Sequence, residues 1–198
     1  MRHQAIAAVF ATLMSFGLIT APAFAQESEV PVLSFADRTP FNFNASALDV
    51  TSLYEAPGVD PNIDHLMPLS PEQAALQWAQ DRIRTVGTND LTVRFLVNDA
   101  AVIQRPLPVK GGFTGFFTTE QAEEYFGSLS VSIELVDSKR KVLASVRGSA
   151  KANQTVPENV SLADREKLWF QLTERMMNEL NTQLEESINV YFRDHLLH

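Results

Sequence analysis

The sequence predicts an α+β domain: a two-layer sandwich in which an antiparallel or mixed sheet of four to five strands carries two long helices on one face. Three observations lead to this prediction. Residues 128–152 alternate between apolar and polar side chains across a charged turn, as a hairpin does, and residues 161–192 and 70–87 have apolar residues at helical spacing. The expected order of elements is β-α-β-β-α-β-β-α.

The first strand is expected over residues 41–54, where aromatic and aliphatic residues occupy alternate positions. The phase of this alternation slips between Ala47 and Leu48, which favours a β-bulge there. Residues 55–69 contain three prolines, one glycine and no apolar period. They are expected to form an ordered surface loop.

The first helix has a clear start signal. Ser70 suits the N-cap, Pro71 the first helical position and Gln73 the position that completes a capping box. The helical pattern continues to Val86, and Gly87 is expected to end it as a left-handed C-cap.

The middle of the chain is predicted to contain two strands, a loop and a short helix. Residues 91–97 alternate as a strand does, and residues 100–109 are expected to return as an edge strand because two prolines weaken its end. Residues 110–117 form a glycine-rich aromatic segment. A short helix is then expected from Thr118 to Phe126.

The hairpin is expected to have strands over residues 128–135 and 142–152, joined by the charged turn 137–141. One face of its second strand carries mostly small side chains, which allow a helix to approach closely. These residues are Val142, Ala144, Val146, Gly148, Ala150 and Ala152.

The last helix is expected to begin after Ser161, whose hydroxyl suits the N-cap, with Asp164 near the positive helix end. Its apolar residues lie within an arc of roughly 160° and are predicted to be buried against the hairpin. They are Leu162, Trp169, Leu172, Met176, Met177, Leu180, Leu184, Ile188 and Tyr191.

Residues 1–25 have the pattern of a secretory signal peptide, with an early basic residue, an apolar run and small residues before a cleavage site after Ala25. We therefore expect residues 26–40 to be an extended N-terminal segment, residues 41–193 a single domain and residues 194–198 a solvated tail. The mature chain is expected to lack a transmembrane segment and to reside in the periplasm of a Gram-negative bacterium.

The composition excludes several classes of site. The chain contains no cysteine, which excludes disulfides, thiolate catalysis, cysteine-ligated metals and a lipidated N-terminal cysteine. Its net charge of −8 disfavours nucleic-acid binding. We found no catalytic or phosphate-binding motif, and we expect neither a cofactor nor a resident metal.

Two groups of residues offer weaker signals for chemistry. His195 and His198 have a spacing that two metal ligands on one helix would use, but the solvated-tail interpretation is favoured. Asp60, Asp64 and His65 lie in the proline-rich loop. An alternative function is therefore a hydrolase or metal-dependent enzyme whose site is assembled from the 60–65 and 99–105 loops.

The glycine-rich segment contains the residues that we predict to bind a partner. Phe113, Phe116 and Phe117 lie among three glycines in a connection expected to run over the surface, where they would expose an apolar patch to an envelope protein or lipid. The alternative, that they fold back to close one end of the core, is also consistent with the sequence.

The element order and the pattern of residues 129–192 resemble small Gram-negative envelope proteins: LptE-like proteins, ABC-transport auxiliary lipoproteins and the TolB N-terminal domain. Those lipoproteins carry an anchoring cysteine at the mature N-terminus, where this chain has Gln26. The resemblance implies a non-enzymatic periplasmic binding or adaptor protein that assists envelope assembly or transport.

Overall fold

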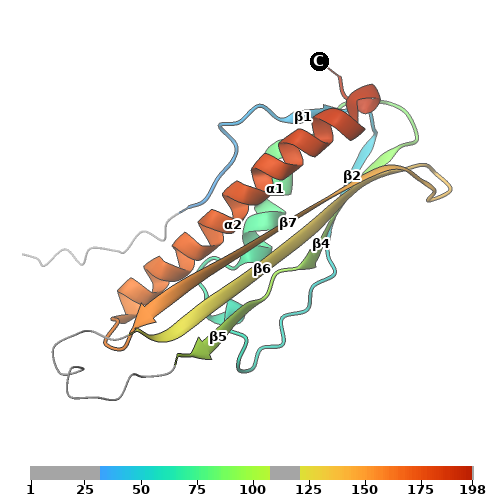
Figure 1. Cartoon of the computed structure of the whole chain (residues 1–198). Coiled ribbons are helices and arrows are strands. Elements are labelled where there is room, and N and C mark those ends of the chain that lie inside the picture. The colour runs from blue at the N-terminus through green and yellow to red at the C-terminus, as the bar shows by residue number, and fades with distance from the viewer. Residues whose placement is uncertain (1–31, 108–120, 198) are drawn as a thin grey trace, which may run out of the picture.

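The computed structural model describes residues 32–107 and 121–197 (Figure 1). Its strands and helices follow one another in the order β1, β2, α1, β3, β4, β5, β6, β7 and α2. Their bounds are β1 Phe41–Phe43, β2 Ala47–Ser52, α1 Pro71–Arg82, β3 Ile83–Thr85, β4 Thr92–Asp99, β5 Val102–Pro106, β6 Gln121–Val136, β7 Val142–Pro157 and α2 Leu162–Tyr191.

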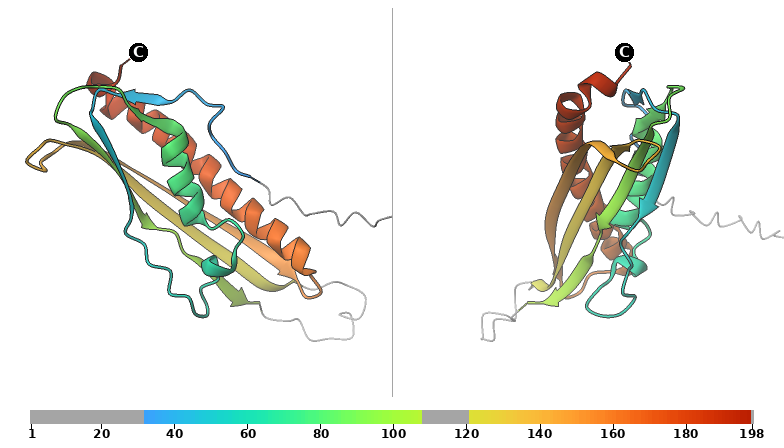
Figure 2. Two further views of the ribbon diagram at one scale, coloured as in Figure 1. Left: turned by 180° about the vertical axis from the view of Figure 1, so that it is seen from behind. Right: turned by 90° about the vertical axis from the view of Figure 1, so that its right-hand side faces the viewer.

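Five strands form the main sheet, with β6 at its centre. β7 pairs antiparallel with the whole length of β6, while β4 and β5 pair antiparallel with successive parts of its opposite edge. β2 extends the sheet by pairing parallel with β4, and β1 and β3 form a separate two-stranded parallel sheet. Both helices cover the same face of the main sheet (Figures 1 and 2). The predicted α+β two-layer sandwich is confirmed.

The predicted hairpin is present and longer than expected. Its charged turn is closed by Asp137, whose Oδ1 accepts hydrogen bonds of 2.9 Å from the backbone N–H groups of both Lys139 and Lys141. Arg140 adopts a φ of 62°, the left-handed conformation that reverses the chain within this turn. β6 and β7 each have 16 residues, so the pairing continues well beyond the predicted start at residue 128.

The short helix expected over Thr118 to Phe126 is wrong from Gln121 onward, where β6 begins. Glu123 to Gly127 pair with β5 on one side and with β7 on the other, so tertiary pairing satisfies their backbone groups on both edges. Tyr125 is fully buried on the helix-covered face. The local helix-start signal is therefore overridden by two long-range strand partners.

The capping box of α1 is confirmed, since Gln73 N–H donates to Ser70 Oγ at 3.2 Å and Ser70 N–H donates to Gln73 Oε1 at 3.1 Å. The predicted end of the helix at Gly87 is wrong, because α1 ends at Arg82 and the next residues form β3 against β1. Gly87 has another role. A Cβ at this position would lie 2.6 Å from the backbone nitrogen of Ala45, so only glycine allows this close approach.

The single strand expected over residues 41–54 is divided in two. The predicted bulge is instead a break between Phe43 and Ala47, where the chain leaves β3 and joins β4. Ala45 is fully buried at the break, and its carbonyl accepts a hydrogen bond from the N–H of Gly87 at 3.0 Å.

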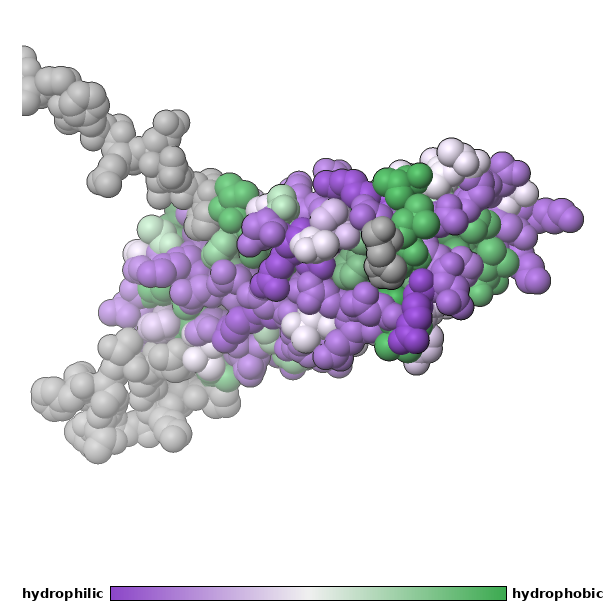
Figure 3. Space-filling model, turned by 90° about the horizontal axis from the view of Figure 1, so that it is seen from above, coloured by the Kyte–Doolittle hydropathy of each residue, from purple (hydrophilic) through white to green (hydrophobic). Residues whose placement is uncertain are grey.

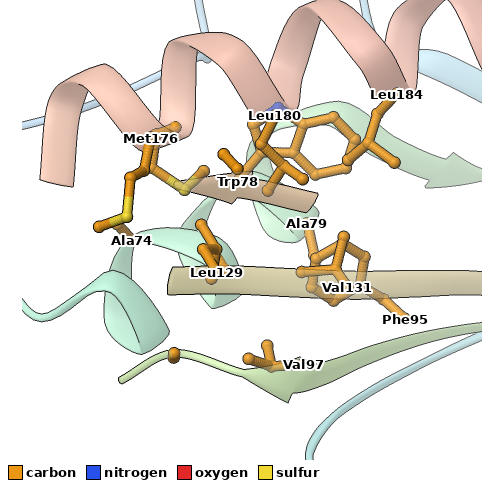
Figure 4. Close-up of a cluster of buried hydrophobic side chains, with 14 of the residues drawn as sticks. Ala74, Trp78, Ala79, Phe95, Val97, Leu129, Val131, Met176, Leu180 and Leu184 are labelled. Atoms are coloured by element: carbon orange, nitrogen blue, oxygen red, sulfur yellow. The ribbon is translucent and has the colours of Figure 1, made fainter. Parts of the chain in front are cut away.

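α2 packs along β7 and β6, as predicted, through a continuous stripe of large apolar residues (Figure 4). The prediction that Leu162 and Tyr191 belong to this stripe is wrong, because they are 69% and 66% exposed. They lie in the first and last turns of the helix, beyond the sheet residues that cover its centre. The small residues of β7 explain the close packing, since a Cβ on Gly148 would lie 2.8 Å from Leu180 Cδ1.

The end of the chain does not extend freely into solvent. The carbonyl of His195 accepts a hydrogen bond from the N–H of Asn44, and the N–H of Leu197 donates to the carbonyl of Asn42, both at 2.8 Å. The expected tail of residues 194–198 thus lies along β1 as far as Leu197.

Candidate functional site

The predicted partner-binding residues Phe113, Phe116 and Phe117 lie in the segment 108–120, outside the described residues. Their exposure stays a prediction. The described part of the chain offers three other candidate sites.

The two loops of the alternative enzymatic interpretation do come together. Ile63 N–H donates to the carbonyl of Val102, and Gln104 N–H donates to the carbonyl of Pro61, both at 2.8 Å. The loop that contains Asp60, Asp64 and His65 therefore runs along β5 as an additional strand-like segment.

The titratable groups of this loop do not gather at one point. Asp60 and His65 are exposed, whereas Asp64 is only 3% exposed. Oδ1 of Asp64 and the hydroxyl of Tyr54 are buried without a hydrogen-bond partner. Burial, followed by the nearby charge of Asp64, raises the pKa of Tyr54, so this phenol stays protonated in the folded protein. Within the described residues, no three histidine or acidic side chains are placed to hold a metal ion.

The second candidate is the sheet face opposite the helices, which we call the open face. It is formed by alternate residues of β2, β4, β6 and β7, and its side chains line up in rows across the strands. In the first row, Arg94 is paired with both Asp49 at 3.7 Å and Glu134 at 3.2 Å. This row has an acidic, a basic and an acidic group on neighbouring strands.

The centre of the open face carries small hydroxyl side chains around Leu96, which lies between Thr51 and Ser132. Ser132 Oγ accepts a hydrogen bond from Asn98 at 3.0 Å, and Ser128 donates to Asp99 at 2.6 Å. Beside these serines, β7 contributes the exposed residues Arg147 and Lys151. The open face is thus a mainly polar surface that carries both signs of charge.

The outer edge of β7 is partly covered by side chains of α2. Gln183 Oε1 accepts a hydrogen bond from Ser149 N–H at 3.1 Å, and Arg175 donates to the carbonyl of Asn153 at 3.0 Å. These contacts occupy edge groups that another strand would otherwise use. The open face is therefore a better candidate for a binding surface than this edge.

The third candidate is a buried arginine at the end of α1. The guanidinium of Arg82 donates to Asn181 at 2.8 Å, forms an ion pair of 2.7 Å with Glu185, and lies 4.8 Å from the ring centre of Phe41. Trp78 donates to the same Asn181 oxygen at 2.9 Å. This cluster joins α1 to α2 through hydrogen bonds and an ion pair, and to β1 through the ring of Phe41.

A cavity of about 270 Å³ lies beside this cluster. Its lining is mixed: apolar residues from both ends of the described chain, and polar residues from β1 and α2. The lining residues are Thr39, Pro40, Phe41, Asn42, Arg82, Glu185, Asn189, Leu196 and Leu197.

Sequence reasoning missed this site, although two signals for it are present. The sequence places Arg82 on the buried face of α1, because it continues a helical spacing of three, one and three residues. The residues with this spacing are Ala75, Trp78, Ala79 and Arg82. Asn181 likewise interrupts the apolar stripe of α2. A polar residue inside an apolar stripe needs a partner when buried, and here the two are partners.

The face of the molecule seen from above is largely hydrophilic. Figure 3 shows the molecule from above, with hydrophobic residues in small, separate patches among hydrophilic ones. In the described part of the chain, neither helix combines the length and the apolar composition needed to cross a membrane.

Comparisons with known proteins give a likeness of structure only. No family model and no curated protein sequence matches the chain. A minor lipoprotein from Acinetobacter baumannii is 12% identical, with 80% of this chain and 99% of that chain covered and a TM-score of 0.38. A Xanthomonas campestris protein of the DUF330 family is 11% identical, with 78% and 90% covered and a TM-score of 0.33.

A lipoprotein from Neisseria meningitidis is 16% identical, with 70% of this chain and 99% of that chain covered and a TM-score of 0.26. All three TM-scores lie below 0.5.

Proposed function

We propose that this protein is a non-enzymatic adaptor of the bacterial envelope that acts in the periplasm and binds a protein partner through its open face. The observation that carries this proposal is the arrangement of the sheet. Both helices cover one face, and the opposite face carries ordered rows of polar and charged side chains. The predicted signal peptide of residues 1–25 supports export of the chain.

The charges of the open face favour a protein over a lipid or nucleic acid. Arg147 is a diagonal neighbour of Glu134, Lys151 lies opposite Ser128, whose hydroxyl donates to Asp99, and the row through Arg94 has acidic groups on both sides. An anionic membrane or a phosphate backbone would select a surface of one positive sign. Interspersed charges instead suit a protein surface with complementary charges, where they set orientation and association rate.

The test is affinity isolation from periplasmic and solubilised envelope fractions, with the tagged mature chain as bait. We expect Arg147→Glu/Lys151→Glu to lose partners that the native chain retains, because two cations on the open face become anions. The matched control is Lys139→Glu/Lys167→Glu, which changes the net charge equally through exposed lysines away from this face. Equal recovery of every partner by both variants and the native chain would refute the proposal.

The aromatic segment supplies a second, separable test. If Phe116 and Phe117 contact a partner, Phe116→Ser/Phe117→Ser leaves the free energy of unfolding nearly unchanged and weakens recovery of that partner. If they close the core instead, the double variant costs several kcal/mol of stability. Urea unfolding followed by circular dichroism distinguishes these results.

A further inference from the structure

We propose that the cavity beside Arg82 binds a carboxylate group carried on a short apolar body, and that Glu185 occupies the place of that carboxylate in the present structure. The inference goes beyond the adaptor function and is independent of it, because the cavity is built from α1, α2, β1 and the chain end and none of its lining residues belongs to the open face.

Arg82 is held in a fixed position. Its side chain is only 3% exposed, Nη1 donates to Asn181, and the guanidinium carbon lies over Phe41 and, at 5.9 Å, near the ring of Trp78. Its Nε is buried without a hydrogen-bond partner. A buried donor left unpaired is costly, but this one has no accessible surface, so an incoming acceptor would bind at Nη2, where Glu185 now lies.

Glu185 is held less firmly. Its side chain is 34% exposed and lies at the border between the buried face of α2 and solvent, where its Oε1 contacts Arg82 Nη2 at 2.7 Å. A rotation about its side-chain bonds would place the carboxylate in water and uncover the edge of the guanidinium. Arg82 has no comparable freedom. Its positive charge would therefore stay in place while the carboxylate of an incoming acid replaces that of Glu185.

The lining of the cavity selects the rest of the ligand. The positive charge of the Arg82 guanidinium favours a carboxylate ligand over an amide of the same shape, which lacks the negative charge. The apolar side chains of Phe41, Leu196 and Leu197 would contact a short aliphatic body, and the volume of about 270 Å³ limits its size. Two sources share this chemistry: a free branched-chain acid and the C-terminal residue of a peptide.

The experiment uses the mature chain with isovalerate as the free acid, N-acetyl-leucine as the peptide terminus and isovaleramide as the uncharged control. Binding is followed by calorimetry and by the NMR signal of the Arg82 Nε–H group. We expect both acids, or one of them, to bind and to shift this signal, while the amide does neither. The acid that binds more tightly identifies the source.

Removal of the competing group gives the sharpest expectation. Glu185→Gln should bind the acid roughly tenfold more tightly, because the binding-competent state no longer requires displacement of an ion-paired carboxylate. Leu197→Asp should weaken binding by adding a negative charge at the rim. Val190→Asp is its matched control, since Val190 is also an exposed aliphatic residue but does not line the cavity.

Three results would overturn the proposal. They are the absence of saturable binding to Glu185→Gln below roughly 50 mM ligand, equal binding of amide and acid, and unchanged binding by Leu197→Asp. Each would assign Arg82 and Glu185 to a structural ion pair. Because none of these variants removes Arg82, the test does not depend on the folding of a chain with an altered core.

Discussion

Two buried glycines let the hairpin approach α2, and exchange of each for alanine tests how tightly the layers are packed. A Cβ on Gly148 would lie 2.8 Å from Leu180 Cδ1 and 3.1 Å from Leu184 Cδ2. Both leucines are fully buried, so neither can move into solvent to make room. We expect Gly148→Ala to lower the free energy of unfolding by about 1–3 kcal/mol, the cost typical of an overpacked core.

Gly127 provides the comparison within the same fold. A Cβ there would lie 2.7 Å from Met176 Cε and 2.8 Å from its Sδ. The end of a methionine side chain rotates about three bonds, so it yields more readily than two branched leucines. Alanine also has fewer conformations than glycine in the unfolded chain, which offsets roughly 0.5–1 kcal/mol of the lost free energy of unfolding at either position. Gly127→Ala should therefore cost about 1 kcal/mol less than Gly148→Ala.

The assay is urea unfolding of the mature chain, followed by circular dichroism and tryptophan fluorescence. The double variant Gly148→Ala/Leu180→Val should be less destabilised than the sum of its two single variants, because the shorter side chain gives the new methyl group space. If Gly148→Ala proves as stable as the native chain, or if the two changes are simply additive, then α2 and β7 are not in the close contact that we infer.

Three further predictions address the helix start, the buried polar cluster and the buried phenols. Ser70→Ala should cost about 1 kcal/mol in urea unfolding because it removes the capping box of α1; no measurable loss would contradict this. Trp78→Phe keeps an aromatic ring in the core, removes the N–H donor to Asn181 and leaves unfilled volume, so the same measurement should show a loss of at least about 1 kcal/mol. Burial raises the pKa of both Tyr54 and Tyr125 above the ordinary 10.0, so the unfolded chain loses these protons first. The contribution of these phenols to the free energy of unfolding should be fully present below pH 10 and should be lost as the pH rises above it. Urea unfolding at several pH values should show a smaller loss for Tyr54→Phe.

Much of the fold was predictable because its main elements have strong local signals. The alternation of β6 and β7, the acidic and basic turn between them, and the stripe of α2 each depend on one element alone. The same holds for the capping box at Ser70. The errors lie where long-range contacts decide: residues 121–126 are a strand because β5 and β7 pair with them, and α1 ends at Arg82 because Ile83 pairs with β1.

The candidate sites were less predictable, since each joins segments far apart in the sequence. The 60–65 and 99–105 segments were placed together only in the alternative enzymatic hypothesis, and their backbones do form hydrogen bonds without gathering their acidic groups. The pairing of Arg82 with Asn181 and Glu185 spans about a hundred residues. Its partners become evident only when the crossing of α1 and α2 is known.

The lengths of the elements explain why one face of the sheet remains polar. A helix of 30 residues extends about 45 Å, and strands of 16 residues extend about 53 Å, so α2 alone can follow nearly the whole hairpin. α1, with 12 residues, covers the neighbouring part of β4, where Trp78 stacks on Phe95. Neither of the two described α-helices covers the second face, and its alternate positions are mainly serine, asparagine and charged residues, with Leu96 and Phe126 as apolar exceptions. A partner bound there would depend on charge and hydrogen bonds, so its affinity should fall with ionic strength, whereas contacts through the phenylalanines of 113–117 should persist in high salt.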